Sequence, residues 1–344
     1  MRAATTWWMG VELARTLLAL VAVSCGSSQT NHYQTSSAPA CASLPPLAVK
    51  AGYTIGFAQV YEVPPAAWRA ANTASILTEG NNRGDVILYQ QGNDSTGVQE
   101  SAQLQSFIDQ KVDAIIMSAE DEVTFAPVVV AAREACIPVF IEDRGVDTTV
   151  AIPGVDYVTY IGSDFVGEGT KAANWLVSHF TTKMNIIELE GTVGSAAALG
   201  RKQGFDAVVA NQSNMTILVS QSGDFNQTQG HDMTKQLVAQ YPTVNVLFSH
   251  NDEMSFGAIA AIQELGLTPG KDITIVSIDG TKQGVQDILN GQIAAIVECN
   301  PFFGPPVFDQ IANYAAGQTV PTAMLNVDQV FDVTNAAGYL PNAF

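Results

Sequence analysis

Charged side chains follow a hydrophobic strand in the segment 137–147, which reads IPVFIEDRGVD. The apolar run ends at Glu142, Asp143 and Arg144, and Gly145 then allows a sharp turn. A surface salt bridge in a solvated loop would explain this pair and would contribute little stability. The alternative is a ligand site at the end of the strand, because carboxylates and guanidinium groups form strong, often bidentate hydrogen bonds.

The same kind of group recurs after the other expected strands. Carboxylates and amides, with few lysines, stand at Gln59, Asn93, Asp94, Glu190, Asp224, Asn251, Asp252 and Asp279. Together with arginine, such groups hydrogen-bond vicinal hydroxyls. Asp279 could instead make an Asx turn before Gly280. Asn251 could cap the helix that follows it. We assign Asn251 to a ligand and the capping or a supporting role to Asp252.

Short apolar strands alternate with helical stretches from residue 53 onward. Strands are expected at 53–60, 85–90, 113–119 and 137–143, separated by helices at 66–84, 98–112 and 122–136. After a connecting region at 157–164 the pattern restarts, with helices at 165–180, 197–212, 227–241 and 254–266 and strands at 185–191, 215–223, 244–252 and 272–280. A strand at 293–300, a helix at 304–317 and a terminal strand near 326–333 follow.

This alternation predicts the α/β class, with two similar lobes that each contain a doubly wound parallel sheet. Ligands of open α/β sheets bind beyond the carboxyl ends of the strands. We therefore expect a ligand in the cleft between the lobes, within reach of the polar strand ends.

The first 25 residues are expected to be an export signal. Residues 13–24 hold an apolar stretch that is too short for a typical transmembrane helix, near Arg2 and Arg15. The run AVSC resembles a bacterial lipobox that would lipidate Cys25, and plain cleavage near residue 25 is the alternative. Residues 26–50 begin with a Ser/Thr/Pro/Gln-rich stretch and are expected to form a flexible tether.

Composition narrows the class of partner. The chain has 344 residues and a formal net charge of −18 with no basic run, which argues against nucleic acid. Neither the histidines nor the cysteines have metal-ligand spacing, so we expect no metal and no cofactor. We expect Cys136 and Cys299 to be unpaired small hydrophobic residues, but the sequence leaves open whether Cys41, Cys136 and Cys299 form a disulfide.

Several segments together resemble the type I periplasmic sugar-binding proteins of ABC importers, in the ribose/galactose-binding group. The similarity spans roughly residues 52–340 and is greatest to the galactofuranose-binding branch. The segments are IGFAQV, WRAA, IPVFIEDRGVD, IIELEGTVGSAAALGRKQGF, SQSGDF, FSHNDEMSFGAIAAIQELGLTPGKDI and SIDG. The resemblance implies a protein that is not an enzyme, captures a monosaccharide and delivers it to ABC permease subunits. It also implies a monomer in the periplasm or on the outer face of the cell membrane.

The resemblance implies a division of the chain as well. The N-terminal lobe would comprise 51–162 and 300–328, and the C-terminal lobe 163–299 and 329–344. A three-segment hinge would join them near 162–164, near Asn300 and near the terminal strand.

Site residues follow from the matching motifs. Asp143 and Arg144 would bind sugar hydroxyls, together with Arg201 of the R-x-x-G-F run, Asn251 and Asp279. Trp68 and Arg69 resemble the galactofuranose branch, since an indole suits the C–H face of a sugar and an arginine can bridge two hydroxyls. Trp68 could also be a core aromatic residue, and Arg201 a solvated helix residue. Glu190, Asn93 and Asp94 are candidates from their position after strands alone.

Three departures from the family pattern bear on the site. The loop 61–67, YEVPPAA, is longer and richer in proline than its equivalent. Gly200 stands where the family often has aspartate. Ribose binders have a glutamine near the last crossover, where this chain has Cys299 and Asn300; Asn300 could supply the amide.

Other functions fit less well. The core of a LacI-type regulator shares the expected fold, but it would bring a helix-turn-helix and a basic face instead of an export signal. A sugar hydrolase would need a defined carboxylate pair, and the sequence singles out none. The GTVGS run lacks the spacing of a nucleophile elbow. A sugar-sensing protein for chemotaxis or signalling would use the same pocket.

Overall fold

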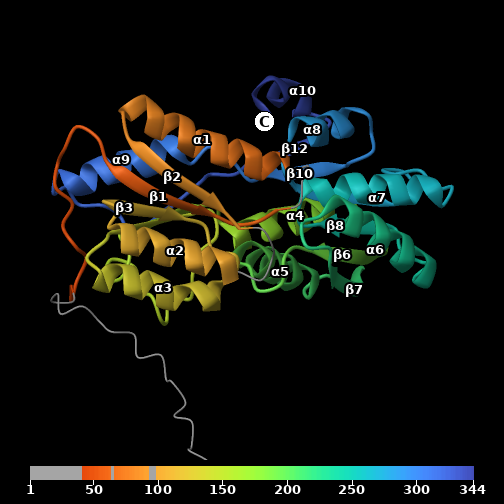
Figure 1. Cartoon of the computed structure of the whole chain (residues 1–344). Helices are drawn as coiled ribbons and strands as arrows, with labels where there is room; N and C mark the ends of the chain where they lie inside the picture. The colour runs from red at the N-terminus through yellow and green to blue at the C-terminus, as the bar shows by residue number, and fades with distance from the viewer. Residues whose placement is uncertain (1–40, 63–65, 93–97) are drawn as a thin grey trace, which may run out of the picture. The chain divides into compact units, whose positions relative to one another are not determined.

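The computed structural model describes residues 41–62, 66–92 and 98–344, and it contains two six-stranded sheets. In the first lobe the strand order is β11-β5-β4-β3-β1-β2, and every neighbouring pair is parallel. Its elements are β1 (Thr54–Gln59), α1 (Ala67–Arg83), β2 (Val86–Gln91), α2 (Val98–Gln110), β3 (Ala114–Met117), α3 (Glu122–Glu134), β4 (Val139–Glu142), β5 (Thr159–Gly162), α9 (Gly304–Ala315) and β11 (Ala323–Leu325). Figure 1 shows α1 and α9 on one side of this sheet and α2 and α3 on the other.

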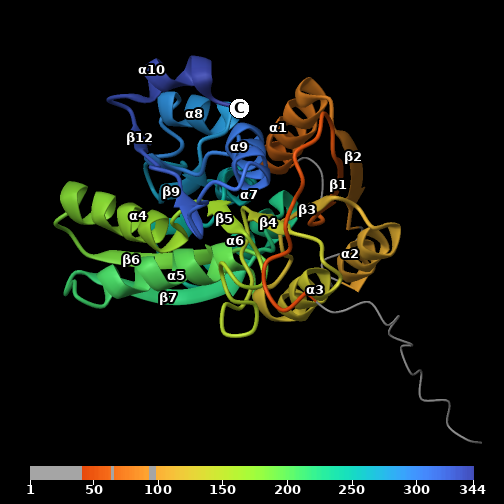
Figure 2. The same cartoon turned by 90° about the vertical axis from the view of Figure 1, so that its left-hand side faces the viewer.

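The second lobe has the strand order β12-β10-β9-β8-β6-β7, in which only β12 is antiparallel to its neighbour. Its elements are α4 (Phe165–His179), β6 (Met184–Glu190), α5 (Ala196–Val209), β7 (Met215–Ser222), α6 (Gln227–Gln240), β8 (Val246–Ser249), α7 (Asp252–Glu264), β9 (Thr274–Asp279), α8 (Lys282–Leu289), β10 (Ala295–Glu298), β12 (Val330–Asp332), α10 (Ala336–Tyr339) and a 3₁₀ turn, η1 (Leu340–Asn342). Figure 2 shows α4 and α5 side by side. The two doubly wound lobes confirm the predicted fold class.

Three elements differ from the sequence expectation. The connecting region at 157–164 contains β5, which completes the first sheet beside β4. The terminal strand expected near 326–333 is β12, and a further strand that was not expected, β11, precedes it and joins the first sheet. Helix α8 lies between β9 and β10, where no helix was expected. Strands β5 and β11 have four and three residues and stand in polar surroundings, so their apolar pattern does not separate them from loops.

The inner strands carry continuous hydrophobic runs because helices cover both faces of each sheet. All residues of β3, β4, β8 and β10 are buried. Three of these strands, β4, β8 and β10, end in the buried polar residues Glu142, Ser249 and Glu298. The chain passes between the sheets three times, after β5, after β10 and between β11 and β12. The carboxyl ends of the strands therefore present polar groups at the boundary between the lobes.

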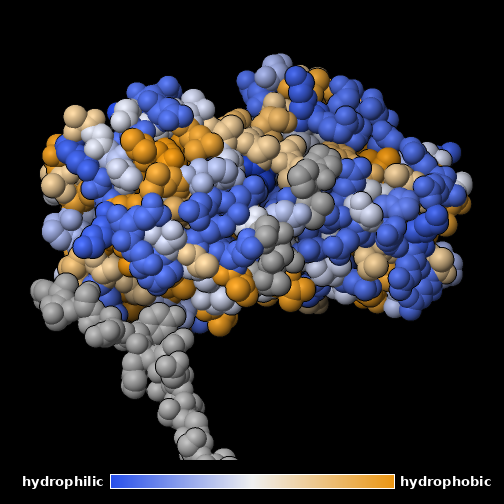
Figure 3. Space-filling view, viewed as in Figure 1, coloured by the Kyte–Doolittle hydropathy of each residue, from blue (hydrophilic) through white to orange (hydrophobic). Residues whose placement is uncertain are grey.

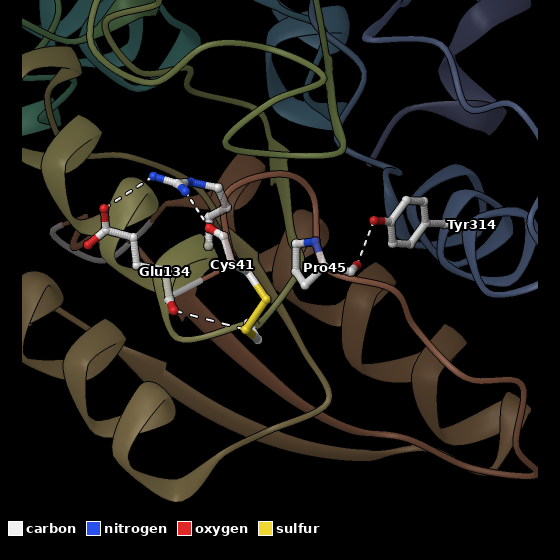
Figure 4. The surroundings of a disulfide bond; sticks show 6 residues. Cys41, Pro45, Glu134 and Tyr314 are labelled. Carbon is white, nitrogen blue, oxygen red and sulfur yellow. Dashed lines mark hydrogen bonds and ion pairs between the residues drawn. A yellow bond between two sulfur atoms is a disulfide. The ribbon is translucent and has the colours of Figure 1, made fainter. Parts of the chain in front are cut away.

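A disulfide joins Cys41 to Cys136, so the expectation that Cys136 is unpaired is wrong. Figure 4 shows this bond, with Pro45 farther along the segment accepting a hydrogen bond of 2.6 Å from the hydroxyl of Tyr314. Residues 41–47, which composition assigned to a flexible tether, are thus fixed to α3 and α9. The two cysteines are 95 positions apart, and sequence spacing alone cannot reveal such a pairing.

The surface shown in Figure 3 is largely hydrophilic, with apolar residues gathered over the outer strands of the first lobe. Val86 of the edge strand β2 is 58% exposed. Within the described part of the chain, no helix is long and apolar enough to cross a membrane. No group of His, Cys, Asp or Glu among the described residues is arranged to hold a metal ion.

Candidate ligand-binding cleft

A cavity lies between the two lobes, and both lobes contribute to its wall. It encloses about 290 Å³ of empty space, its mouth included. Its lining residues are Glu62, Trp68, Arg69, Asp143, Arg144, Ala197, Arg201, Phe225, Asn251, Asp279 and Cys299. The structure therefore brings together Trp68, Arg69, Asp143, Arg144, Arg201, Asn251 and Asp279 from the predicted set. Glu190 lies away from this cavity, and Asn93 and Asp94 are outside the described residues.

The end of β4 supplies Asp143 and Arg144, which are 4% and 2% exposed and so do not form a surface salt bridge. Asp143 has a left-handed backbone, with φ of 55°, which turns the chain at the strand end. Its carboxylate accepts hydrogen bonds from Arg69 at 2.7 Å and from Ser118 at 3.1 Å. Arg144 instead donates to Glu62 at 2.9 Å. The two adjacent residues thus have different main partners, and both remain at the cavity wall.

Arg69 and Trp68 come from the first turn of α1. Arg69 donates to Asp143, to Glu62 at 3.1 Å and to Gln59 at 2.9 Å. Burial alone would lower the pKa of Arg69, but the carboxylates of Asp143, Glu62 and Glu142 outweigh it and raise the pKa above its ordinary value. Trp68 is 6% exposed, and its indole N–H donates to the carbonyl oxygen of Cys299 at 2.7 Å. Trp68 is therefore both a packed aromatic residue and part of the wall.

Glu142, which had no predicted role, lies beneath this arginine. It is fully buried and accepts a hydrogen bond of 2.8 Å from Asn72. Burial and the nearby Asp143 charge raise the pKa of Glu142 to about 8. Asn72 in turn accepts from Gln59 at 2.7 Å. This network supports Arg69 from below, and its signal in the sequence is a polar residue three positions after Arg69, on the same face of α1.

In the second lobe, Arg201 of α5 is 3% exposed and so is not a solvated helix residue. It donates to the fully buried Glu168 of α4 at 2.7 Å and to the carbonyl oxygen of His250 at 2.5 Å. Asp279 lies 3.8 Å from the same guanidinium. Burial alone would lower the pKa of Arg201, but Glu168 and Asp279 help to raise it above its ordinary value.

Close helix packing brings Arg201 to Glu168. A Cβ atom on Gly204 would lie 2.0 Å from the carbonyl oxygen of Val166, and one on Gly200 would lie 2.7 Å from the Cβ of Phe165. Neither position can accommodate a side chain without moving α4 away from α5. Gly200 and Gly204 are therefore needed for this close approach of α5 to α4.

Asn251 is the N-cap of α7, which corrects the assignment of that role to Asp252. The side-chain oxygen of Asn251 accepts from the backbone N–H of Met254 at 3.0 Å, and its amide nitrogen donates to Glu253 at 3.0 Å. Asn251 has the extended backbone typical of an N-cap, whereas Asp252 is already helical. The Asp252 carboxylate binds Ser277 and the residues that begin α8.

Asp279 ends β9 with a positive φ of 128° and is 3% exposed. One oxygen accepts from the backbone N–H of Asp252 at 3.4 Å, so the side chain is directed at the N-terminus of α7 instead of turning back on Gly280. Burial raises the pKa of Asp279 well above its ordinary value, although the Arg201 charge lowers it.

Two other candidates have different surroundings. Glu190 pairs with Lys202 at 3.3 Å and its side chain is 25% exposed. The side chain of Asn300 accepts from the backbone N–H of Phe302 at 2.9 Å, so this amide is engaged outside the cavity. Cys299 lines the cavity, and burial raises the pKa of its thiol.

Sequence reasoning missed four wall residues, namely Glu62, Ala197, Phe225 and Cys299. Glu62 lies in the loop 61–67, whose length and proline content had already marked it as a departure near the site. Phe225 follows β7, but a search for polar groups after strands passes over an aromatic ring. The guanidinium of Arg144 lies 5.1 Å from the Phe225 ring centroid, a cation–π contact across the cleft.

Comparisons with known proteins agree with this geometry. The periplasmic binding protein domain matches residues 62–318, and the chain belongs to that family. The galactofuranose-binding protein YtfQ of Escherichia coli K12 is 35% identical over 305 residues, 88% of this chain and 92% of that protein. The resemblance drawn from the sequence motifs is thus confirmed.

Two solved structures are similar over 84% of this chain. One, from Mycobacterium smegmatis in complex with β-D-fucofuranose, is 37% identical with a TM-score of 0.78 and is covered over 94% of its length. The other is the binding protein of the arabinose ABC transporter from Shewanella sp. ANA-3, bound to α- and β-L-arabinofuranose, with 34% identity, a TM-score of 0.78 and 95% coverage. The chain is a binding protein and not an enzyme.

Proposed function

We propose that this protein captures a monosaccharide in its furanose form, galactofuranose or a related sugar, and delivers it to the permease subunits of an ABC importer. The observation that carries the proposal is the interlobe cavity, where three buried arginines lie among carboxylates from both lobes. The relatives and structures named above that are described with galactofuranose, fucofuranose and arabinofuranose support the furanose ring.

Free hydrogen-bonding capacity supports a polyhydroxylated ligand. Nη1 of Arg144, which forms an ion pair of 3.5 Å with Glu120, and Nε of Arg69 are buried and have no hydrogen-bond partner among the described residues. Leaving a buried donor unsatisfied costs about 1–3 kcal/mol, and more for a charged group. Sugar hydroxyls would accept from these donors and donate to Asp143 and Asp279. The Trp68 ring would cover an apolar face of the sugar.

The charge of the wall narrows the ligand class. The wall contains three arginines, Arg69, Arg144 and Arg201, and three carboxylates, Glu62, Asp143 and Asp279. This formal balance favours a neutral sugar over a sugar phosphate.

Closure of the lobes would couple binding to recognition by the permease. Contacts from both lobes exist together only in the closed state, so the sugar shifts the equilibrium toward it. We place the hinge at the three crossings near 162–164, 298–300 and 326–329, and keep the lobe division expected from the sequence. Export through the signal at 1–25, with Cys25 as a lipid anchor, and a monomeric state in the periplasm complete the proposal.

Isothermal titration with free and ring-locked sugars tests the function. Free L-arabinose, D-galactose and D-fucose, which contain some furanose, are expected to bind with micromolar or better affinity. Their methyl pyranosides, locked in the six-membered ring, are expected not to bind. Equal binding of the locked forms would contradict the furanose assignment. The absence of binding by these and all other free sugars below about millimolar concentration, an affinity of roughly −4 kcal/mol, would contradict sugar capture.

A further inference from the structure

One hydrogen bond crosses the cleft between an element of each lobe. Helix α1 begins at Ala67, follows Ala66, and has no side-chain cap of its own. Glu253, in the first turn of α7, accepts a hydrogen bond of 2.8 Å from the backbone N–H of Ala67. Glu253 is 4% exposed, so this contact is shielded from water.

We propose that Glu253 caps α1 from the opposite lobe, so that it positions Trp68 and Arg69 and acts as a latch of the closed state. This inference rests on the sugar-binding function proposed above. Trp68 and Arg69 are the two residues directly after Ala67, so the cap fixes the helical turn that carries them.

The first N–H groups of a helix lack partners within the helix, and a suitable acceptor stabilises them. Most other helices of the two lobes meet this need from their own residues. Side chains immediately before the helix accept the bond in six cases: Asp121, Asp164, Ser195, Asn226, Asn251 and Thr281. Helix α1 instead obtains its acceptor from the second lobe. Opening the cleft removes that acceptor. The first turn of α1 is therefore more stable in the closed state than in the open state.

The latch is connected to the cavity on the side of the second lobe as well. The other carboxylate oxygen of Glu253 accepts a hydrogen bond of 3.0 Å from the side-chain amide of Asn251, which lines the cavity. Glu253 thus joins a wall residue of the second lobe to the turn that carries two wall residues of the first.

A second hydrogen bond crosses the cleft without involving Glu253. The backbone N–H of Glu122, at the start of α3, donates to the carbonyl oxygen of Gly194 at 3.3 Å. This contact involves only main-chain atoms and would persist when the side chain of Glu253 is replaced. Closure would therefore be weakened by such a replacement but not abolished.

The surroundings of Glu253 make the equilibrium between the closed and open states depend on pH. Burial, followed by the charges of Glu62 and Asp252, raises the pKa of Glu253 to about 8, while the N–H of Ala67 opposes this rise. In an open cleft the carboxyl group would contact water and titrate near its ordinary value of about 4.3. Between these two pKa values, the Glu253 carboxylate therefore takes up a proton when the cleft closes. The closed state is accordingly favoured below the open-state pKa and loses this advantage as the pH rises through about 8.

The test measures the closed-to-open ratio directly in the sugar-free, full-length protein. Spin labels at Ala102→Cys and Ala239→Cys, both exposed positions on helices of different lobes, report the interlobe distance by pulsed electron spin resonance. At about pH 4.5, close to the open-state pKa of Glu253, Glu253→Ala is expected to lower the ratio about 3- to 30-fold, the range of a lost capping acceptor. At the same pH, Glu253→Gln keeps an acceptor oxygen and is expected to stay within about 3-fold of the wild-type protein; at higher pH it should be the more closed of the two, because it closes without taking up a proton.

Two further readouts separate the latch from general stability and from the proposed function. Between about pH 6 and pH 9 the ratio should fall in the wild-type protein, and less in Glu253→Gln, in which only the raised pKa values of Asp252 and Asp279 remain. Glu253→Asp, with its shorter reach, should behave like Glu253→Ala. A ratio that is the same in Glu253→Ala as in the wild-type protein would overturn the latch. A protein that binds no sugar but shows these changes would overturn only the proposed function.

Discussion

In the first lobe two arginines share their carboxylates, whereas in the second lobe a single arginine has its own fully buried partner. Arg69 and Arg144 both donate to Glu62, whose side chain is 13% exposed, and Arg69 also holds Asp143. Arg201 is paired at 2.7 Å with Glu168, which has no exposed surface. The sharing in one lobe and the single close pair in the other, with Asp279 farther away at 3.8 Å, have different physical consequences.

Shared partners allow exchange, because Arg69 keeps Gln59 as an acceptor and Arg144 keeps its ion pair with Glu120 at 3.5 Å when Glu62 turns to a ligand. A close, fully buried pair fixes geometry, since the cost of leaving a buried charge alone is high. We infer that the second lobe offers a rigid donor and the first lobe an adjustable network. Three substitutions, taken from the largest expected effect to the smallest, would break or sharpen this contrast.

Glu168→Ala is expected to destabilise the second lobe by about 3–5 kcal/mol, because it leaves Arg201 buried without its partner. Urea unfolding followed by circular dichroism measures the change. Glu190→Ala is the matched control in the same lobe, since its pair with Lys202 is partly exposed and should contribute less than about 1 kcal/mol. Similar losses of unfolding free energy in the two variants would show that Glu168 is not the main structural partner of Arg201.

Replacing Cys41 and Cys136 by serine should lower stability by about 2–4 kcal/mol, mainly through the first lobe, which contains the whole bridge. Sugar affinity should change less than about 2-fold, because Cys136 precedes β4 and Asp143 follows its other end. Denaturation and titration of the same sample provide both values, and reduced wild-type protein is the control. An affinity loss as large as the stability loss would mean that the network of the first lobe depends on the bridge.

Asp143→Ala should weaken sugar binding by about 10- to 100-fold, equivalent to roughly 1.4–2.8 kcal/mol, by removing an acceptor from a closed cleft. Stability should change less, because Glu62 and Gln59 still accept from Arg69. Asp143→Asn is the matched variant, since asparagine tolerates the left-handed backbone at this position. Titration calorimetry measures the affinity of both variants for the sugar that binds in the titrations described under the proposed function. An unchanged affinity in the alanine variant would remove Asp143 from the site.

Sequence reasoning found the wall residues at strand ends from position and those on helices from the family motifs. Asp143 directly follows β4 and Asp279 ends β9, and the parallel sheets carry both to the cleft. Trp68 and Arg69 of α1 and Arg201 of α5 were found only through the matching motifs. Glu168 could not be found in this way, because it is 33 positions from Arg201 and only the packing of α4 on α5 joins them. Ala197 and Phe225 escaped notice because their contribution is shape and an aromatic face instead of hydrogen-bonding groups.

The fold, like the site, could be predicted where the local sequence pattern is strong and not where tertiary contacts decide the structure. Runs such as 114–117 and 137–141 predicted strands because their residues are almost all apolar. Strands β5 and β11 are too short to produce such a pattern, and they form where the chain crosses between the lobes. Residues 41–47 have a loop-like composition, and a disulfide and the contact to Tyr314 hold them in place.

The disulfide also bears on the order in which the chain can assemble. The covalent ring from Cys41 to Cys136 encloses β1 to β3 and α1 to α3 and nothing of the second lobe. A chain delivered N-terminus first can close this ring before any residue of the second lobe has arrived. The first sheet would still lack β4, β5 and β11, the last of which comes from near the C-terminus. In the export proposed above, the bridge would hold an unfinished sheet together while the rest of the polypeptide is translocated.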